Sequence, residues 1–203
     1  MQPRLRTSWP AQCFARARSR SVPSSHSLPR VRIVAGEHRG ARIYAPKGDA
    51  TRPTSDRVRE AAFNLIGPVD GASVLDLFAG SGAMGLEALS RGASTATFVD
   101  SDRDACRTID RNVEKLRVTG ATVLQRDAFQ ALAADRRSYD LVLCDPPYGF
   151  DQDSRIAPYL ARALAPDGLV VYETTSRREP ALDGLRIRTS RTYGSARLTL
   201  FEH

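Results

Sequence analysis

Short apolar runs and amphipathic segments alternate along the chain from about residue 71 onward. The apolar runs have the length of buried strands, whereas the segments between them repeat apolar residues at helical spacing. Such an alternation implies right-handed crossovers and a parallel sheet that helices cover on both faces. The predicted strands are 73–78, 95–100, 122–125, 141–145 and 169–173, and the predicted helices are 84–91, 103–117, 128–134 and 153–164.

The end of the chain departs from this alternation. Residues 185–191 and 197–201 both have the pattern of strands, and the short segment around Tyr193-Gly194-Ser195 joins them without a helix. Strands joined by so short a connection pair antiparallel. The pattern therefore predicts a doubly wound α/β fold with seven strands, mostly parallel, whose last strand is antiparallel.

A short hairpin and a helix are predicted ahead of the alternating region. Residues 31–35 and 41–44 alternate around a turn with glycine at both ends, which is typical of a hairpin. Residues 50–56 then form a loop whose last residues favour a helix N-cap. The predicted outward residues of the hairpin are Arg32, Arg39 and Arg42; in the helix, Val58, Ala62, Leu65 and Ile66 recur at helical spacing and leave Arg57, Arg59 and Glu60 largely on the other face.

Positive charge is concentrated at the front of the chain. Residues 1–60 hold 13 Lys and Arg against 4 Asp and Glu, a net charge of +9, whereas residues 61–203 hold 17 against 19, a net charge of −2. A basic front beside a near-neutral body is typical of a protein that holds a polyanion with one part and processes it with another. A solvated basic tail without a partner has the same composition.

Residues 1–29 are rich in arginine and serine and contain no acidic residue. Such a segment buries too little apolar surface to offset its ordering entropy, so we expect it to be disordered. Its composition also matches an organelle transit peptide, and it fits a mis-assigned start codon or an RNA-binding arm equally well.

Composition excludes other classes of protein. No run approaches the roughly 18 uninterrupted apolar residues that a bilayer span requires, so we expect a soluble protein of the cytoplasm. Cys13, Cys106 and Cys144 are far apart and odd in number, which fits neither a disulfide framework nor paired metal ligands. The three histidines are not spaced as metal ligands either, and we expect no metal.

A glycine-rich turn follows the first long strand, at Gly80-Ser81-Gly82. Glycines let a ligand approach the backbone closely, and the N–H groups at the following helix start attract anionic or carboxylate groups. Asp76 precedes this turn and would lie near a ligand ammonium. Asp100 closes the next strand, where a carboxylate accepts hydrogen bonds from ribose hydroxyls, and Asp127 could face an adenine amino group. Each of these acids, taken singly, also fits a helix cap or a turn.

A second motif, Asp145-Pro146-Pro147-Tyr148, ends the apolar run at 141–144. The carboxylate and a carbonyl of the Pro-Pro pair can accept the two N–H bonds of an amino group on a base, so that its lone pair points at a methyl donor. Prolines fix the backbone and remove competing N–H donors. The tyrosine ring supplies a surface for base stacking, worth about 1 to 3 kcal/mol per base. The motif therefore indicates methylation of a nucleobase amino group.

Together these motifs resemble the class I S-adenosylmethionine (SAM)-dependent methyltransferases, which have a Rossmann-like fold. Residues 32–36, 51–60 and the segment at Tyr193-Gly194 resemble, more narrowly, the bacterial RsmD family of 16S rRNA guanine-N2 methyltransferases. The resemblance runs from about residue 32 to residue 201. It implies SAM as cofactor and 16S rRNA as partner, either free or within a partly assembled small subunit, and we expect a monomer without membrane contact.

The resemblance divides the chain into 1–29, a basic extension; 30–66, a hairpin and helix that contact RNA; and 67–203, the SAM-dependent methyltransferase domain. The expected residues are Asp145, Pro146, Pro147 and Tyr148 for catalysis; Asp76, Phe78, Gly80, Gly82, Asp100, Ser101, Asp127 and Ala128 for the cofactor; and Arg32, Arg39, Arg42, Arg57 and Arg59 for RNA.

Gly80 to Gly85 also matches the G-x-G-x-x-G pattern of nicotinamide dehydrogenases, but no hydride-transfer His or Tyr-Lys pair follows. Two alternatives to the RNA methyltransferase stay open. A DNA adenine-N6 methyltransferase shares the tetrapeptide, although it usually carries a larger target-recognition insertion. A basic nucleic-acid-binding module with an inactive methyltransferase body would bind RNA without regard to SAM. Cys144 is expected to be a buried hydrophobe, not a nucleophile.

Overall fold

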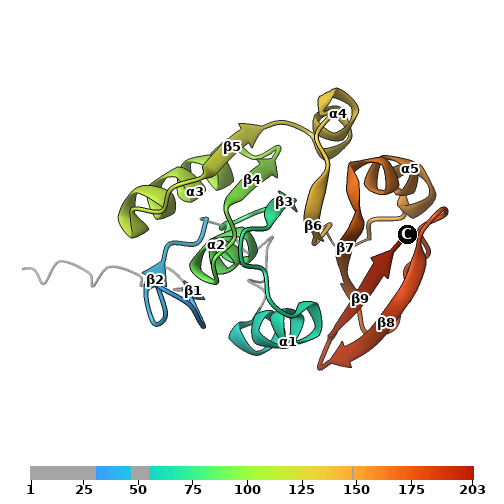
Figure 1. Ribbon diagram of the computed structural model, residues 1–203, viewed down its shortest axis with the longest axis horizontal. Helices are drawn as coiled ribbons and strands as arrows, with labels where there is room; N and C mark the ends of the chain where they lie inside the picture. Colours follow the sequence, from blue (N-terminus) through green and yellow to red (C-terminus); the bar gives the residue numbers. More distant parts are fainter. Residues whose placement is uncertain (1–30, 47–54, 148) are drawn as a thin grey trace, which may run out of the picture.

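The computed structural model describes residues 31–46, 55–147 and 149–203. Its centre is a seven-stranded sheet in the order β5-β4-β3-β6-β7-β9-β8 (Figure 1). All neighbouring strands from β5 to β7 pair parallel, and β9 pairs antiparallel with both β7 and β8. The predicted doubly wound fold with one antiparallel strand near the end of the chain is therefore confirmed. The strands are β3 (Ser73–Leu77), β4 (Thr95–Asp100), β5 (Ala121–Gln125), β6 (Tyr139–Cys144), β7 (Leu164–Thr175), β8 (Arg186–Tyr193) and β9 (Ala196–Glu202).

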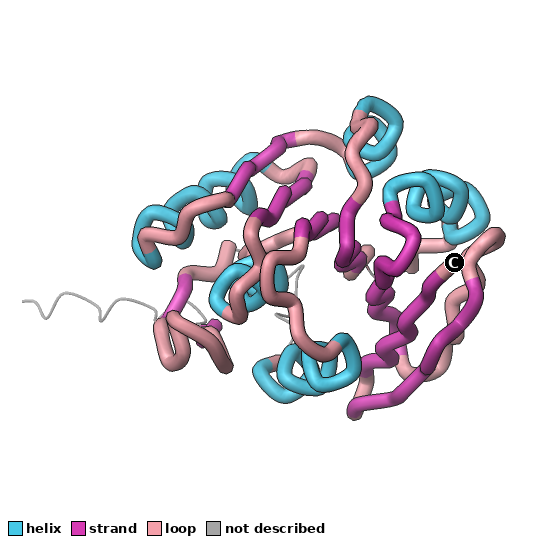
Figure 2. The backbone as a smooth tube through the Cα atoms, viewed as in Figure 1, coloured by secondary structure: helices cyan, strands magenta, loops and turns pink. Residues whose placement is uncertain are grey.

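Helices cover both faces of this sheet, as Figure 2 shows. Side chains alternate between the faces along each strand, so that Leu141 and Leu143 join one core cluster whereas Val142 and Cys144 join the other. The first cluster packs against α1, α2, α3 and the N-terminal hairpin, and the second packs against α4 and α5. The helices are α1 (Asp56–Ile66), α2 (Ala83–Ser90), α3 (Arg103–Leu116), α4 (Ala128–Ala134) and α5 (Asp153–Ala163).

The predicted hairpin is present as two short antiparallel strands, β1 (Val31–Arg32) and β2 (Arg42–Ile43). It packs on α2, because the backbone of residues 34–38 bonds to two buried side chains of that helix. Glu87 accepts hydrogen bonds from the N–H groups of Val34 (2.7 Å) and Ala35 (2.9 Å). The Ser90 hydroxyl donates to the Ala35 carbonyl (2.6 Å). The hairpin therefore shares the core of the main body.

The start of α1 follows the sequence prediction. The Ser55 hydroxyl accepts a hydrogen bond from the Val58 N–H (3.3 Å), which satisfies one of the free donors of the first helical turn. Val58 and Ala62 face the core, and the helix packs against β7 and β9. Helix α1 therefore lies over the half of the sheet that contains the antiparallel strand.

Strand β7 is longer than the predicted 169–173. Tyr139 of β6 pairs with Leu164, directly after α5, and the register then shifts before Leu141 pairs with Leu169. Residues 165–168 form this irregularity, and a Cβ at Gly168 would lie 2.9 Å from the Tyr139 carbonyl oxygen. Pairing with β6 resumes at Leu169, so β7 extends back to Leu164 across this irregular segment.

Within the described ranges, no helix is long and apolar enough to cross a membrane. The expected extension 1–29 and the segment 51–54 of the resemblance lie outside the described residues.

Candidate active site

Acidic residues form a row along the carboxyl ends of the parallel strands, which we call the edge of the sheet. Asp100 ends β4, Asp76 lies near the end of β3, Glu173 lies near the end of β7, and Asp127 and Asp145 follow β5 and β6. The strand order places them as Asp127, Asp100, Asp76, Asp145 and Glu173 across the edge. The order of the strands along the chain reverses between β3 and β6, which is the point where doubly wound sheets bind ligands.

The glycine turn between β3 and α2 adopts a conformation that suits glycine. Gly80 and Gly82 have φ angles of 55° and 74°, in the left-handed region, and Gly82 begins α2 without a side-chain cap. A Cβ at Gly85 would overlap the ring of Phe98. Gly85 therefore leaves no room for a side chain, and the N–H groups of Gly80, Gly82 and Gly85 are bonded within the fold to Asp100, Ala79 and Asp76.

Asp76 is buried beside this turn. Its carboxyl group accepts a hydrogen bond from the Gly85 N–H (2.9 Å). The pKa of Asp76 is raised to about 8, mainly by burial; the Gly85 hydrogen bond lowers it, and the negative charges of Asp145 and Asp100 raise it. At neutral pH the carboxyl is thus mostly protonated, and a cation bound beside it would favour the ionised form.

Asp100 and Asp127 are both bonded to backbone. Asp100 accepts hydrogen bonds from the N–H groups of Gly80 (2.8 Å) and Asp102 (2.9 Å), which joins the glycine turn to the start of α3. Asp127 caps α4 by accepting from Phe129 (2.9 Å) and Gln130 (3.2 Å). A carboxylate offers about four acceptor sites, so these structural bonds leave capacity for a ligand.

Three further residues were expected at the cofactor. Phe78 has a φ angle of 57°, and its ring contacts Phe150 edge to face at 5.6 Å, which links the glycine turn to the loop after β6. Ser101 is exposed directly after β4, whereas Ala128 is buried at the start of α4. All three lie at the same edge of the sheet as the acidic row.

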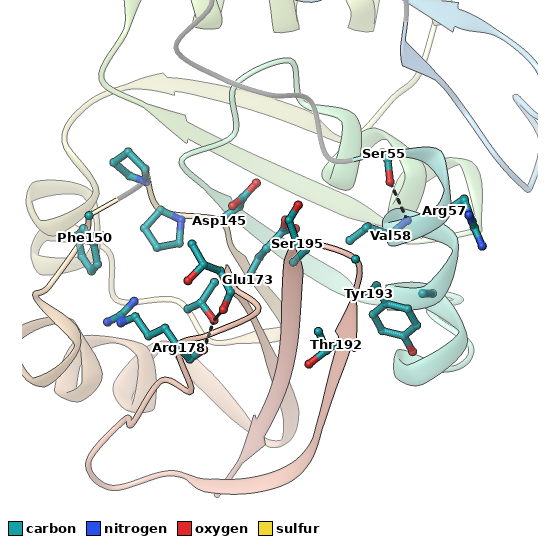
Figure 3. A pocket seen from close by; sticks show the side chains of 18 of the residues that line it. Ser55, Arg57, Val58, Asp145, Phe150, Glu173, Arg178, Thr192, Tyr193 and Ser195 are labelled. Atoms are coloured by element: carbon teal, nitrogen blue, oxygen red, sulfur yellow. Dashed lines mark hydrogen bonds between the residues drawn. The ribbon is translucent and has the colours of Figure 1, made fainter.

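The Asp145-Pro146-Pro147 segment lies next to Asp76, at the end of the neighbouring strand. Asp145 is exposed and lines a cavity of about 970 Å³ (Figure 3). The cavity lies between α1, the loop after β6, the end of β7 and the β8–β9 turn. Tyr148 lies outside the described residues, so its stacking role stays a prediction.

Sequence reasoning missed three residues of this cavity: Glu173, Arg178 and Ser195. Glu173 carried a signal, because it ends the predicted strand 169–173 as other acids end theirs. Arg178 forms an ion pair with Asp153 of α5. Its place and that of Ser195 depend on how the β7 and β9 ends pack beside α1, which no local pattern records.

The arginines expected to contact RNA differ in their exposure to solvent. Arg32, Arg39 and Arg42 are exposed on the hairpin, and Arg32 pairs with Asp56 at 3.2 Å. Arg57 is exposed on α1 and lines the large cavity. These four are accessible to a polyanion.

The structure corrects the predicted position of Arg59. The sequence placed it on the exposed face of α1, but its side chain is fully buried. Its guanidinium donates to the Arg32 carbonyl and to Asp56 (2.8 Å), and it pairs with Glu87 at 3.4 Å. The prediction of an exposed RNA-contacting Arg59 is wrong, because the buried Glu87 of α2 offers it a partner inside the fold.

Comparison with known proteins gives a consistent set of relatives. The family model described as "Conserved hypothetical protein 95" matches residues 31–202. YlbH of Bacillus subtilis (strain 168) is 38% identical over 184 residues, 85% of this chain and 98% of that protein. Ribosomal RNA small subunit methyltransferase D of Escherichia coli (strain K12) is 40% identical over 127 residues, 62% of this chain and 64% of that protein.

Solved structures agree with these relatives. The structure of yhhF from Escherichia coli has a TM-score of 0.78 and 32% identity, and the match covers 86% of this chain and 98% of that one. A hypothetical protein from a Thermus species has a TM-score of 0.73 and 31% identity, with 85% and 99% covered. SMU.776, solved with SAH, is 15% identical with a TM-score of 0.66, covering 81% and 54%, and shares the fold.

Proposed function

Because the chain belongs to the RsmD family, we propose that it is a SAM-dependent methyltransferase of small-subunit ribosomal RNA. The finer proposal is that it methylates the exocyclic N2 amino group of one guanine. The relative named ribosomal RNA small subunit methyltransferase D supports the rRNA substrate. The observation that carries the chemistry is the position of Asp145-Pro146-Pro147 beside Asp76 at the switch point, open to the large cavity.

The residues at the glycine turn fit SAM by the chemistry of their groups. The turn of Gly80 and Gly82 and the start of α2 after it can hold the amino-acid part of the cofactor, because the positive end of the helix dipole lies there. The carboxylate of Asp100 suits two ribose hydroxyls, and Asp127 suits the adenine amino group. Asp76 lies where an ammonium group would favour its ionised form. When bound, SAM supplies an electrophilic methyl group, so no covalent intermediate with the protein is required.

Asp145 and the proline carbonyls would then align the acceptor nitrogen. The carboxylate accepts one N–H bond of the guanine amino group, and a carbonyl of the Pro146-Pro147 pair accepts the other. These two bonds direct the nitrogen lone pair toward the methyl group. Holding the two reacting atoms in line in this way raises the rate of methyl transfer. The methylated nitrogen loses a proton, and the exposed Asp145 carboxylate can pass that proton to solvent.

The basic front would hold the RNA around the target. Arg32, Arg39 and Arg42 present cations on the hairpin, and Arg57 presents one at the cavity. Phosphate contacts of this kind position a nucleic acid without reading its sequence. We therefore assign RNA contact to residues 30–66 and methyl transfer to residues 67–203, with the target base turned out of its stack to reach the cavity.

The test uses labelled SAM and three substrates: rRNA that lacks the modification, assembled small subunits that lack it, and DNA without adenine methylation. The product nucleoside is identified after digestion. N2-methylguanosine supports the proposal, N6-methyladenine supports a DNA adenine methyltransferase, and the absence of product with intact RNA binding supports a binding module.

An Asp145→Asn variant tests the assigned chemistry. We expect turnover to fall about 10²-fold or more, because a positioned acid or base group contributes about that factor, while SAM affinity stays unchanged. Asp151→Asn is the matched control, since Asp151 is an exposed acid that lines the same cavity. Equal losses of turnover and SAM affinity in Asp145→Asn would mean that the carboxylate is structural.

A further inference from the structure

Glu173 is a second carboxylate beside Asp145. Strands β6 and β7 are parallel neighbours, and Cys144 pairs in register with Tyr172, so the next residues of the two strands are Asp145 and Glu173. Side chains alternate along a strand and Tyr172 belongs to the α4–α5 face, so Glu173 points to the α1 face. Asp145 follows the end of β6 and lines the same cavity beside α1. Adjacent strands lie about 4.8 Å apart. Figure 3 shows the two side chains on one wall of the cavity.

The two acids also meet deeper in the site. Both line a small recess of about 20 Å³ that Asp76 and Met84 line too. Asp145 and Glu173 line both the recess and the large cavity, and Asp76 of β3 lines the recess only. The Glu60 and Asp151 carboxylates line the large cavity but not the recess. Of the acids that line the large cavity, only Asp145 and Glu173 also line the recess beside Asp76 in the part of the chain that the structure describes.

The backbone holds Glu173 in a defined place. Strand β7 is flanked by β6 and β9, and Glu173 pairs with Leu198. The residue is half-buried and lines the cavity, so part of its surface is removed from water. A group on a central strand keeps a more exact position than one on a loop, which suits the reading of a base edge.

Guanine presents two adjacent kinds of donor along its Watson–Crick edge, the N2 amino group and the N1–H. Adenine and 2-aminopurine carry a lone pair at N1 instead. A carboxylate opposite N1 accepts a hydrogen bond from guanine but repels the N1 lone pair of the other bases. Two neighbouring carboxylates therefore match guanine, one for N2–H and one for N1–H.

We propose that Glu173 is the residue that selects guanine, by accepting the N1–H while Asp145 accepts an N2–H. This assignment rests on the proposed function, because it takes the guanine amino group as the acceptor. Its role is specificity rather than methyl transfer, so its loss changes which base is accepted more than whether transfer occurs.

The test compares guanine with 2-aminopurine at the target nucleotide. Small subunits are reconstituted with ligated rRNA that carries either base at the position identified by the labelling experiment. Both bases have the amino group at C2, but 2-aminopurine lacks the N1–H. The measured quantity is the ratio of kcat/KM for guanine to kcat/KM for 2-aminopurine, in the wild type, Glu173→Gln, Glu173→Ala and the control Glu60→Gln.

We expect the wild type to prefer guanine by about 10²-fold or more, because a site built around a hydrogen bond rejects an analogue that lacks it. Both Glu173 variants should lower this preference about 10-fold or more, since Gln can turn its amide donor toward N1 and Ala removes the acceptor. Glu60→Gln should keep the wild-type preference. The preference is a ratio within one variant, so a smaller folded fraction cancels.

A wild-type preference below about 3-fold would overturn the proposal, as would Glu173 variants that keep the full preference. The 2-aminopurine also lacks O6, but recognition of O6 by another residue would stay the same across the variants. A wild type that forms N2-methylguanosine while the Glu173 variants discriminate normally would reject only the role of Glu173. The absence of N2-methylguanosine in the wild type would reject the proposed function with it.

Discussion

Glu87 of α2 is a buried carboxylate that joins the N-terminal hairpin to the main body. It accepts hydrogen bonds from the N–H groups of Val34 and Ala35, at 2.7 and 2.9 Å, and from Nε of Arg91 at 2.8 Å. It also pairs with the fully buried Arg59 at 3.4 Å. A Glu87→Gln substitution keeps the size of the side chain but replaces one acceptor oxygen with a donor, which then faces other donors.

The expected loss of stability follows from these contacts. Removing one partner of a buried ion pair costs about 3 to 5 kcal/mol, because the other charge is left in the interior. Arg59 keeps Asp56 as a partner at 2.8 Å, which favours the lower end of that range. We therefore expect Glu87→Gln to lower the free energy of unfolding by about 3 kcal/mol. For a chain of this size that corresponds to a fall in Tm of about 6 to 12 °C.

The assay combines thermal unfolding, followed by circular dichroism, with hydrogen exchange of the Val34 and Ala35 amides. Both amides should exchange faster in the variant, because the hairpin can then detach locally from α2 without unfolding of the sheet. Glu114→Gln is the control, since Glu114 is an exposed acid on α3. A loss below about 1 kcal/mol together with unchanged exchange would refute the reasoning, because it lies well under the cost of a broken buried pair.

Two further predictions concern the glycine turn. Asn112 of α3 donates to the Ser81 carbonyl (3.0 Å) and makes two hydrogen bonds with the Tyr44 backbone, so Asn112→Ala should cost about 1 to 3 kcal/mol and weaken SAM binding several-fold. Calorimetric titration with SAM checks this, and unchanged affinity would contradict it. Burial raises the pKa of Asp76 from 3.8 to about 8, so its contribution to stability without ligand is full below about pH 4 and is lost as the pH rises to about 8. Denaturant unfolding across that range should show Asp76→Asn gaining stability relative to the wild type, and parallel profiles would refute it.

Strong periodicity allowed several elements to be predicted with their bounds. Strand 95–100 and helix 128–134 match β4 and α4, because one is an apolar run between turns and the other starts at the capping residue Asp127. The extension of β7 back to Leu164 was not predictable in the same way. Leu164 pairs with Tyr139 of the neighbouring strand, and the residues between Leu164 and Leu169 favour a turn by themselves.

The residues of the candidate site likewise include some that the sequence predicts and some that it does not. The glycine turn and Asp145-Pro146-Pro147 are contiguous, so their chemistry is visible as a motif, and the parallel topology brings them to one edge of the sheet. Glu173 carried the weaker signal of an acid near a strand end. Its neighbour in space, Asp145, follows β6, and α5 separates the two acids along the chain.

Arg59 shows where local pattern misleads. A cation among apolar residues at helical spacing is assigned to the polar face, since a lone buried charge is costly. Only the packed fold supplies Glu87 and the Arg32 carbonyl, which make burial favourable.

The alternation of apolar and polar residues was thus sufficient for the doubly wound sheet, and the two contiguous motifs were sufficient for the class of chemistry, because both depend on neighbours along the chain. The large cavity, the carboxylate of Glu173 beside Asp145 and the buried network that holds the hairpin were decided by packing. Each brings together residues from separate elements, and their energies depend on partners and burial that exist only once those elements have met.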